Sequence, residues 1–263
     1  MTNGEQLTIE QAIANLEGDD LGLRLYSAWW LGRFRVKDGR AISALVKALS
    51  DQDDRTPNGG YPLRRNAARA LGKVGNSLVV GDLIKCLSCE DFYVREAAAQ
   101  ALEMINDRSA IPPLLALLAH PEAVPLPAPD PPCLTQPFDA IIEALGTLGA
   151  VEAIPLIQPY LNHAVPRIRF ASARALYQLS PDRDYYGQIL IDGLNSPDLQ
   201  LRRAVLADLG AIGYLKAASP VAQTLAENSL KLIALRGILE QNLPPDYLNP
   251  DTIGVMDLMD ALL

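Results

Sequence analysis

Three cationic side chains, Arg65, Arg69 and Lys73, lie four residues apart in one segment of the chain. On an α-helix this spacing places them in a single row along one face. Guanidinium groups bind carboxylates through paired hydrogen bonds, so such a row can bind an anionic ligand. An equivalent row nearer the N-terminus contains Trp29 and Arg33, which adds an aromatic ring for stacking. The rows predict an anion-binding surface; the alternative is a solvated helix face with one amphipathic tryptophan.

Each row belongs to a short pattern that recurs along the chain. In this pattern an arginine is followed by small residues three and six positions later, then by leucine and, in several copies, glycine. The complete and degenerate copies begin at these positions: Arg24, Arg64, Arg95, Phe138, Arg169, Arg202 and Lys231. They recur about every 30 residues, with two longer intervals, which indicates a repeat protein.

A second apolar run with helical spacing follows most copies of the pattern, for example AISALVKAL and AIPPLLALL. Each repeat is therefore predicted to be two antiparallel helices, which bury their apolar faces by stacking on neighbouring repeats. No run alternates polar and apolar residues as a strand does, so almost no strand is expected. The prediction is an all-α fold, a right-handed α-solenoid of helix pairs that is curved and has a concave face.

We expect one solenoid to span residues 1–263. A proline-rich insertion at 121–137 cannot be helical, and it either loops out or divides the solenoid into two stacked halves. The C-terminal tail, residues 243–263, starts with LPPDYLNP and ends in an amphipathic stretch. That stretch is interpreted as a cap or a partner-docking helix, and the cap is favoured because the end of a solenoid must be covered.

The repeated arginines also have a purely structural interpretation. Asp20, Asp91 and Asp198 each precede one of them by four residues, which predicts an aspartate–arginine ladder that joins the repeats. Cys86 and Cys89 form a CxxC pair, but buried cysteines are ordinary in an apolar helix and no further ligands complete a zinc site. No metal site is therefore expected.

Charge and motifs exclude several classes of function. The 263 residues include 31 acidic and 23 basic ones, a net charge of −8, which is unfavourable for binding nucleic acid. Three cysteines fit a reducing compartment, and the sequence has neither a signal peptide nor an apolar stretch of about 18 residues. Phosphate-binding glycine loops and a GxSxG nucleophile are missing. We expect a cytosolic protein with no nucleic-acid or membrane partner.

Particular strings are more specific than the repeat, and they resemble the E subunit of the E/F-type phycobilin lyases, a family of HEAT-like repeat proteins. The resemblance is carried by YSAWWLGRFRV (26–36), DDRTPNGGYPLRRNAARALGKVG (53–75), DFYVREAAAQALEM (91–104) and TQPFDAIIEALGTLGA (135–150). It continues in LRRAVLADLGAIGYLKA (201–217) and NSLKLIALRGILE (228–240) and covers almost the whole chain. Helix packing alone does not require the strings WWLGRFRV and GGYPLRRNAARALG. The resemblance is therefore more specific than the general similarity that all HEAT-like repeats share.

The resemblance implies a heterodimer with an F-type subunit in a cyanobacterial cytoplasm or a red-algal plastid stroma. The pair would bind phycocyanobilin as substrate, with no prosthetic group, and attach it through a thioether to a cysteine of the apo phycocyanin α-subunit. Two alternatives stay open, an isomerising lyase for the phycoerythrocyanin α-subunit and a non-catalytic HEAT-like chaperone or adaptor of phycobiliproteins. The proline-rich insertion is not expected of the family, so the acceptor preference stays open.

That chemistry requires cations for two propionates, aromatic faces for the pigment, and a carboxylate near its pyrrole N–H groups. The candidate bilin-binding residues are Arg33, Arg65 and Arg69, for the propionates or the acidic acceptor surface, and Tyr26, Trp29, Trp30, Tyr61 and Tyr93 for stacking. The candidate catalytic carboxylates are Asp53, Asp54 and Asp91. Because the nucleophile belongs to the acceptor, we expect this chain to act by holding one conformation of the pigment.

Overall fold

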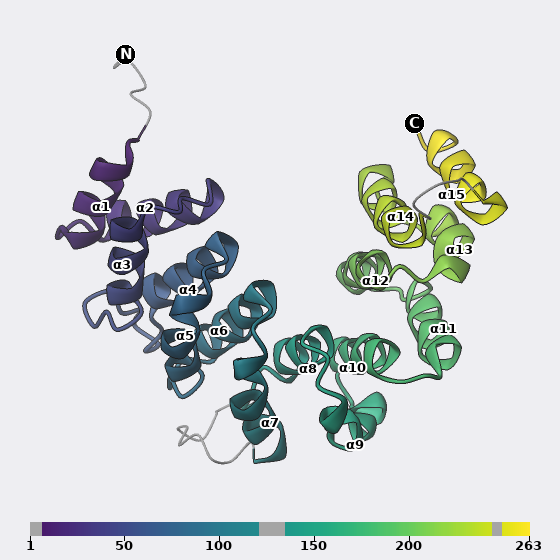
Figure 1. The fold of residues 1–263 in the computed structure, drawn as a ribbon, viewed down its shortest axis with the longest axis horizontal. Coiled ribbons are helices and arrows are strands. Elements are labelled where there is room, and N and C mark those ends of the chain that lie inside the picture. Colours follow the sequence, from purple (N-terminus) through teal and green to yellow (C-terminus); the bar gives the residue numbers. More distant parts are fainter. Residues whose placement is uncertain (1–6, 121–134, 244–248) are drawn as a thin grey trace. The chain divides into compact units, whose positions relative to one another are not determined.

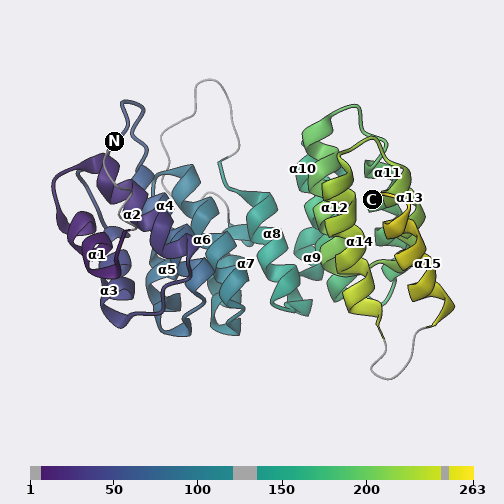
Figure 2. The same ribbon diagram turned by 90° about the horizontal axis from the view of Figure 1, so that it is seen from above.

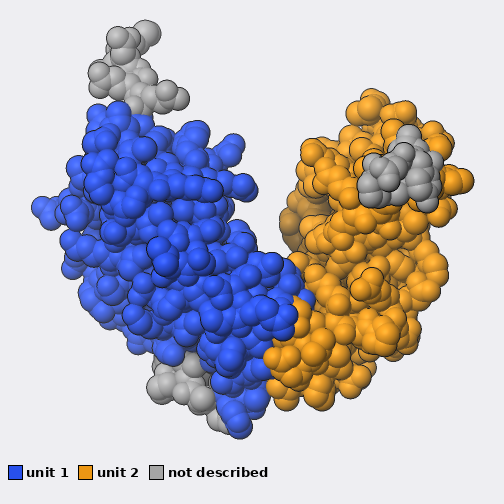
Figure 3. Space-filling model, viewed as in Figure 1, with its two compact units in different colours: residues 1–148 blue, residues 149–263 orange. Residues whose placement is uncertain are grey.

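Helices make up the regular secondary structure of this computed structural model, which describes residues 7–120, 135–243 and 249–263 (Figure 1). No strand occurs in these ranges, so the predicted all-α fold is confirmed. The chain divides into two compact units, residues 1–148 and residues 149–263 (Figure 3). Residues 121–134 of the predicted insertion and 244–248 of the predicted tail lie outside the described ranges.

Unit 1 is a stack of helix pairs. Its first helices are α2 (Leu21–Arg33), α4 (Pro62–Val74), α6 (Phe92–Ile105) and α8 (Phe138–Thr147). Its second helices are α3 (Gly39–Ala48), α5 (Val80–Cys86) and α7 (Ile111–Ala119), and α1 (Ile9–Glu17) precedes them all. Two 3-10 segments, η1 (Ser77–Val79) and η2 (Arg108–Ala110), lead into α5 and α7. The first helices pack side by side, and each second helix packs against the first helix of the next repeat (Figure 2).

Unit 2 continues the pattern, with α10, α12 and α14 as its first helices. Its helices are α9 (Ile154–Ile157), α10 (Pro166–Leu179), α11 (Arg183–Gly193), α12 (Leu199–Ile212), α13 (Ala218–Gln223), α14 (Asn228–Asn242) and α15 (Pro250–Asp260). Its 3-10 segments are η4 (Val151–Ala153), η5 (Gln158–Asn162) and η6 (Leu215–Ala217). Helix α15 packs against α13 and α14 and buries Val255, whereas Ile253 and Met256 stay exposed. No helix within the described ranges is long and apolar enough to cross a bilayer.

The small residues of the repeat allow the first helices to approach closely. A Cβ added to Gly32 would lie 2.7 Å from the Cα of Ala70, and a Cβ added to Gly72 would lie 2.7 Å from the Cα of Ala101. Both distances are far below van der Waals contact, so a larger residue would push the helices apart. The same contact repeats from α2 to α4 and from α4 to α6, which keeps these helices in one register.

The predicted arginine ladder exists, but its predicted aspartate partners are wrong. Asp20, Asp91 and Asp198 each accept a hydrogen bond from a backbone N–H in the first turn of their own helix. A helix N-terminus has unpaired N–H groups, and a capping carboxylate satisfies them. Arg95, 1% exposed, donates instead to the carbonyl oxygens of Cys89, Glu90 and Thr135. Arg202 also donates to backbone carbonyls, whereas Arg24 donates to the carbonyl of Leu16 and pairs with Asp51.

We predict that Gly72→Ala lowers the free energy of unfolding by about 2 kcal/mol or more, because the new methyl group overpacks the α4–α6 contact. Urea unfolding followed by circular dichroism measures the change. The matched control is Gly81→Ala, on α5, where an added Cβ meets nothing within 4 Å; its effect should stay within about 0.5 kcal/mol. Equal stabilities for the two variants would contradict the close approach of α4 and α6.

Candidate functional site

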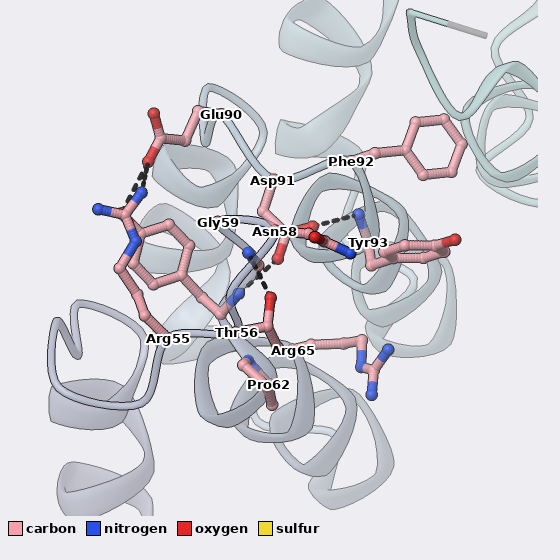
Figure 4. A pocket seen from close by; sticks show the side chains of 12 residues that line it. Arg55, Thr56, Asn58, Gly59, Pro62, Arg65, Glu90, Asp91, Phe92 and Tyr93 are labelled. Atoms are coloured by element: carbon pink, nitrogen blue, oxygen red, sulfur yellow. Dashed lines mark hydrogen bonds and ion pairs between the residues drawn. The ribbon is translucent and has the colours of Figure 1, made fainter. Parts of the chain in front are cut away.

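A pocket of about 560 Å³ lies in unit 1 between the inserted loop before α4 and the start of α6 (Figure 4). Its volume falls within the range of small-molecule sites, roughly 300–1,000 Å³. The lining residues are Arg55, Thr56, Asn58, Gly59, Gly60, Tyr61, Pro62, Arg65, Glu90, Asp91, Phe92 and Tyr93. Four of the predicted site residues are therefore brought together here, namely Tyr61, Arg65, Asp91 and Tyr93.

Tyr61 forms part of the wall, and its side chain is buried, with two guanidinium groups close to the ring. The guanidinium carbon of Arg64 lies 3.7 Å from the ring centroid and that of Arg55 lies 4.7 Å from it. The hydroxyl donates to Glu90 Oε1 at 2.7 Å, and this hydrogen bond raises the pKa of Tyr61. Arg55 donates to the same carboxylate oxygen at 2.8 Å. Two cations and one carboxylate thus fix the ring, and the loop that carries it, against the start of α6.

Asp91 joins the loop to α6 through both of its carboxylate oxygens. Oδ2 accepts a hydrogen bond of 2.6 Å from the backbone N–H of Tyr61, and Oδ1 accepts one of 2.8 Å from the backbone N–H of Tyr93. A carboxylate that accepts backbone N–H bonds at both oxygens is held in place. Its position therefore defines the distance between the two walls of the pocket.

Arg65 and Tyr93 lie beside each other at the opposite end of the pocket from Arg55 and Glu90 (Figure 4). The Arg65 guanidinium carbon is 5.8 Å from the centroid of the Tyr93 ring, which is 56% exposed. Within the described part of the chain, the buried Nε of Arg65 has no hydrogen-bond partner and its guanidinium has no ion-pair partner. A buried N–H group without a hydrogen-bond partner is unfavourable, and an anion in the pocket would accept its hydrogen bond. Burial raises the pKa of the nearby Glu96, and the charge of Arg65 partly opposes that effect.

The other predicted bilin-binding residues lie outside this pocket. Arg69, one turn after Arg65, forms an ion pair of 3.7 Å with Glu96. Tyr26 and Trp29 stack on each other on the exposed side of α2, with ring centroids 5.7 Å apart. Trp30 packs against Phe34 at 5.0 Å, and Arg33 is exposed at the last position of α2. Trp29 and Arg69 occupy equivalent repeat positions on two helices that pack side by side.

The two loop carboxylates predicted as catalytic have different surroundings, and neither lines the pocket. Asp53 is exposed and lies 3.7 Å from Arg24. Asp54 is buried, and its Oδ2 has no hydrogen-bond partner among the described residues. Burial raises the pKa of Asp54, and the neighbouring charge of Asp51 adds to the effect.

The described residues contain no group of three or more histidine, cysteine, aspartate or glutamate side chains able to hold a metal ion. Cys86 and Cys89 are free thiols. Burial raises the pKa of Cys86 to about 12, so its thiol stays protonated and unreactive near neutral pH.

Sequence reasoning missed Arg55, Thr56, Asn58 and Glu90 as parts of the pocket. The inserted loop with its Pro-Asn-Gly-Gly turn marked the segment, because such a turn is not needed to connect two helices. No local pattern indicated Glu90, since its bonds to Arg55 and Tyr61 join residues 35 and 29 positions apart.

Comparison with known proteins places the chain among helical repeat proteins of one kind. The model of the PBS lyase HEAT-like repeat matches residues 23–51 and 139–163, and that of HEAT repeats matches residues 60–125. Phycocyanobilin lyase subunit alpha of Microchaete diplosiphon is 64% identical over 98% of this chain and 90% of its own length. The chain belongs to the family of phycocyanobilin lyase alpha subunits.

Two further known proteins are similar to this chain. The solved complex of CpcE and CpcF of phycocyanin lyase from Nostoc sp. PCC7120 is similar with a TM-score of 0.87 and 54% identity, over 100% of this chain and 97% of that one. The bilin biosynthesis protein PecE of Mastigocladus laminosus is 44% identical over 91% of this chain and 84% of its own length. The resemblance read from the sequence is thereby confirmed.

The raised pKa of Asp54 predicts a pH-dependent contribution to stability. A carboxyl whose pKa is higher in the folded than in the unfolded protein favours folding below its ordinary value of 3.8 and loses that contribution as the pH rises through the folded value. The unfolding free energy of wild type minus that of Asp54→Asn should therefore fall with rising pH and then level off. Urea titrations from about pH 3 to about pH 8 measure it.

Asp53→Asn is the matched control, because it removes a neighbouring carboxylate that is exposed. A pH-independent difference between wild type and Asp54→Asn would show that the buried carboxyl titrates as it does in the unfolded chain.

Proposed function

We propose that this chain is one subunit of a heterodimeric bilin lyase, which attaches phycocyanobilin through a thioether to a cysteine of the phycocyanin α-subunit. The similarity to phycocyanobilin lyase alpha subunits along almost the whole chain supports the activity. The similarity to one partner in the CpcE–CpcF complex supports a heterodimer with an F-type subunit. The complex that the chain resembles at 54% identity is that of a phycocyanin lyase, which favours phycocyanin as the acceptor. The compartment we propose is the cyanobacterial cytoplasm.

The buried Nε of Arg65, which lacks a hydrogen-bond partner among the described residues and lies beside Tyr93, is the observation that connects this activity to the pocket. Phycocyanobilin is an open-chain tetrapyrrole with two propionate groups. A propionate at Arg65 would satisfy the buried Nε and neutralise the guanidinium, since carboxylates bind this group with charge-assisted hydrogen bonds. The exposed ring of Tyr93 offers a flat apolar face to the conjugated pigment. Both interactions are available at one end of the same pocket.

The remaining pocket residues hold the walls in place. Tyr61 is buried and has two guanidinium groups close to its ring, so we assign it the role of positioning the loop rather than stacking on the pigment. Asp91 has both oxygens engaged by backbone N–H groups, so we assign it a positioning role as well. We assign no pigment contact to Asp53 or Asp54, because neither lines the pocket.

The reaction requires a thiol from the acceptor and an oriented pigment from the lyase. The cysteine sulfur bonds to the exocyclic ethylidene carbon, and the proton of the thiol is transferred to the tetrapyrrole, so that the addition balances without an oxidant or a reductant. An enzyme that fixes one pigment conformation near the attacking thiol accelerates such a step by orientation. Arg65 and Tyr93 would supply that orientation from this subunit.

We predict that Arg65→Met lowers the rate of pigment attachment about tenfold or more, because it removes a charge-assisted hydrogen bond while keeping an unbranched side chain. Co-expression with the F-type subunit, a source of phycocyanobilin and the apo acceptor gives a fluorescent covalent product whose rate of formation is measured. Arg69→Met should have a smaller effect, since Arg69 is paired with Glu96 outside the pocket.

Lys85→Met serves as the control. It removes an exposed cation on α5 that is paired with Asp82, away from the pocket, and should leave attachment unchanged. If the Arg65→Met variant attaches the pigment at the wild-type rate, the pocket is not where this subunit binds the pigment.

A further inference from the structure

Several arginines and lysines of unit 1 have neither an ion pair nor a bond to a backbone carbonyl among the described residues. Apart from Arg65 in the pocket, they gather at one edge of the unit. Six of its arginines and lysines pair with carboxylates: Arg24, Arg40, Lys47, Arg55, Arg69 and Lys85. Arg64 and Arg95 donate to backbone carbonyls. Apart from Arg65, the cations without such a partner in the described part of the chain are Arg33, Arg35, Lys37, Lys73 and Arg108. We call these five residues, with the exposed Phe34 and Met104, the loop edge.

The loop edge lies where the first helices of three successive repeats end. Arg33 ends α2 and Arg35 and Lys37 follow it, and Lys73 is in the last turn of α4. Met104 is in the last turn of α6, and Arg108 begins η2 just after it. The three helices pack side by side in one register, as the close approaches at Gly32 and Gly72 require, so their ends meet at the same edge of unit 1 (Figure 2). All five cations are exposed, as are Phe34 at 58% and Met104 at 49%.

The carboxylates at this edge are already in use. Asp38 caps α3 and pairs with Arg40, and these bonds lower its pKa to about 2. Asp107 caps η2 through the backbone N–H of Ser109. Glu103 accepts a hydrogen bond from the hydroxyl of Thr147. The charge of Asp38 is offset by Arg40, and the five cations outnumber Glu103 and Asp107, so these residues form a net positive surface in a chain of net charge −8.

Arg35 occupies a backbone position that is unfavourable for arginine. Its φ is 49°, in the left-handed region, and its N–H donates to the carbonyl of Gly32 where α2 ends. The equivalent positions after other first helices hold Gly75, Asn106 and Gly213, with φ of 74°, 58° and 64°. Glycine and asparagine suit this conformation, whereas a side chain such as that of arginine is strained in it. Since Arg35 gains no ion pair within the described residues, stability does not account for its presence, and strain of this kind accompanies function.

We propose that the loop edge is the docking surface for an acidic face of the protein that receives the pigment. The surface spans three helices, about 20 Å at ordinary interhelical distances, and its five cations exceed the two carboxylates of the pigment. Exposed Phe34 and Met104 among the cations fit a protein interface, where apolar anchors are surrounded by charges. Complementary charge would steer the acceptor onto this edge.

The path from the loop edge to the pocket favours the acceptor as the occupant. Lys73 and Arg65 lie on one row of α4, eight residues apart, which corresponds to about 12 Å along the helix. A protein docked at the edge therefore has its surface close to a pigment held at Arg65. This proposal rests on the proposed function, because that function defines which protein receives the pigment.

Binding of the labelled apo acceptor to the purified heterodimer, without pigment, tests the proposal. The triple variant Lys37→Glu, Lys73→Glu, Arg108→Glu should weaken binding about tenfold or more at low salt, and wild-type affinity should fall as salt rises. The control triple Lys47→Glu, Lys85→Glu, Lys216→Glu changes the net charge equally at exposed positions elsewhere and should bind as the wild type does. The proposal is overturned if both triple variants bind the acceptor equally well. It is also overturned if the first triple variant loses its F-type subunit while the binding of the acceptor is unaffected.

Arg35→Gly separates docking from folding. It should leave the melting temperature unchanged or raise it, because glycine suits the left-handed conformation, and yet weaken acceptor binding severalfold. Asn106→Gly makes the same backbone change after α6 and should leave binding unchanged. Binding by Arg35→Gly at wild-type strength counts against the loop edge. Since binding is measured without pigment, a heterodimer that docks the acceptor but attaches no bilin refutes the proposed function alone.

Discussion

Buried arginines that bind backbone carbonyl groups hold the turns of unit 1 in place, and the candidate site depends on them. The side chain of Arg95 is nearly inaccessible to solvent, and it donates to three carbonyl oxygens and to the side chain of Gln136. Arg64 donates to the carbonyl of Asp51 in the inserted loop. Turns carry backbone groups that no helix satisfies, and buried groups of this kind must be paired. The same bonds that join the repeats therefore fix the segments that become the pocket walls.

Two consecutive arginines show how the fold divides structure from function. Arg64 points into the stack, covers one face of Tyr61 and supports the inserted loop. Arg65, turned by about 100° around the same helix, points into the pocket beside Tyr93 and keeps a buried nitrogen without a partner among the described residues. The repeat requires the first arginine for packing, and the pocket makes the second one available for an anion. Tyr61, Glu90 and Asp91 then hold the walls at a defined separation.

The helices and their stacking could be predicted from the sequence, because apolar periodicity and the recurring small residues report directly on packing. Four of the candidate residues meet in one pocket, since the inserted loop and the start of α6 are adjacent in successive repeats. The aspartate–arginine ladder was mispredicted, because helix N-termini compete for the same carboxylates. The covered ring of Tyr61 and the role of Glu90 depend on contacts between distant residues, which no local pattern encodes. The strained backbone of Arg35 likewise becomes visible only in the structure.

An experimental structure of the heterodimer with phycocyanobilin bound would test the central claim most directly. The account predicts a propionate oxygen within hydrogen-bond distance of the Arg65 guanidinium, with the pigment against the exposed ring of Tyr93. The Tyr61 ring should keep its contacts with Arg55 and Arg64. A pigment bound elsewhere on the complex, with Arg65 still lacking an anionic partner, would contradict it.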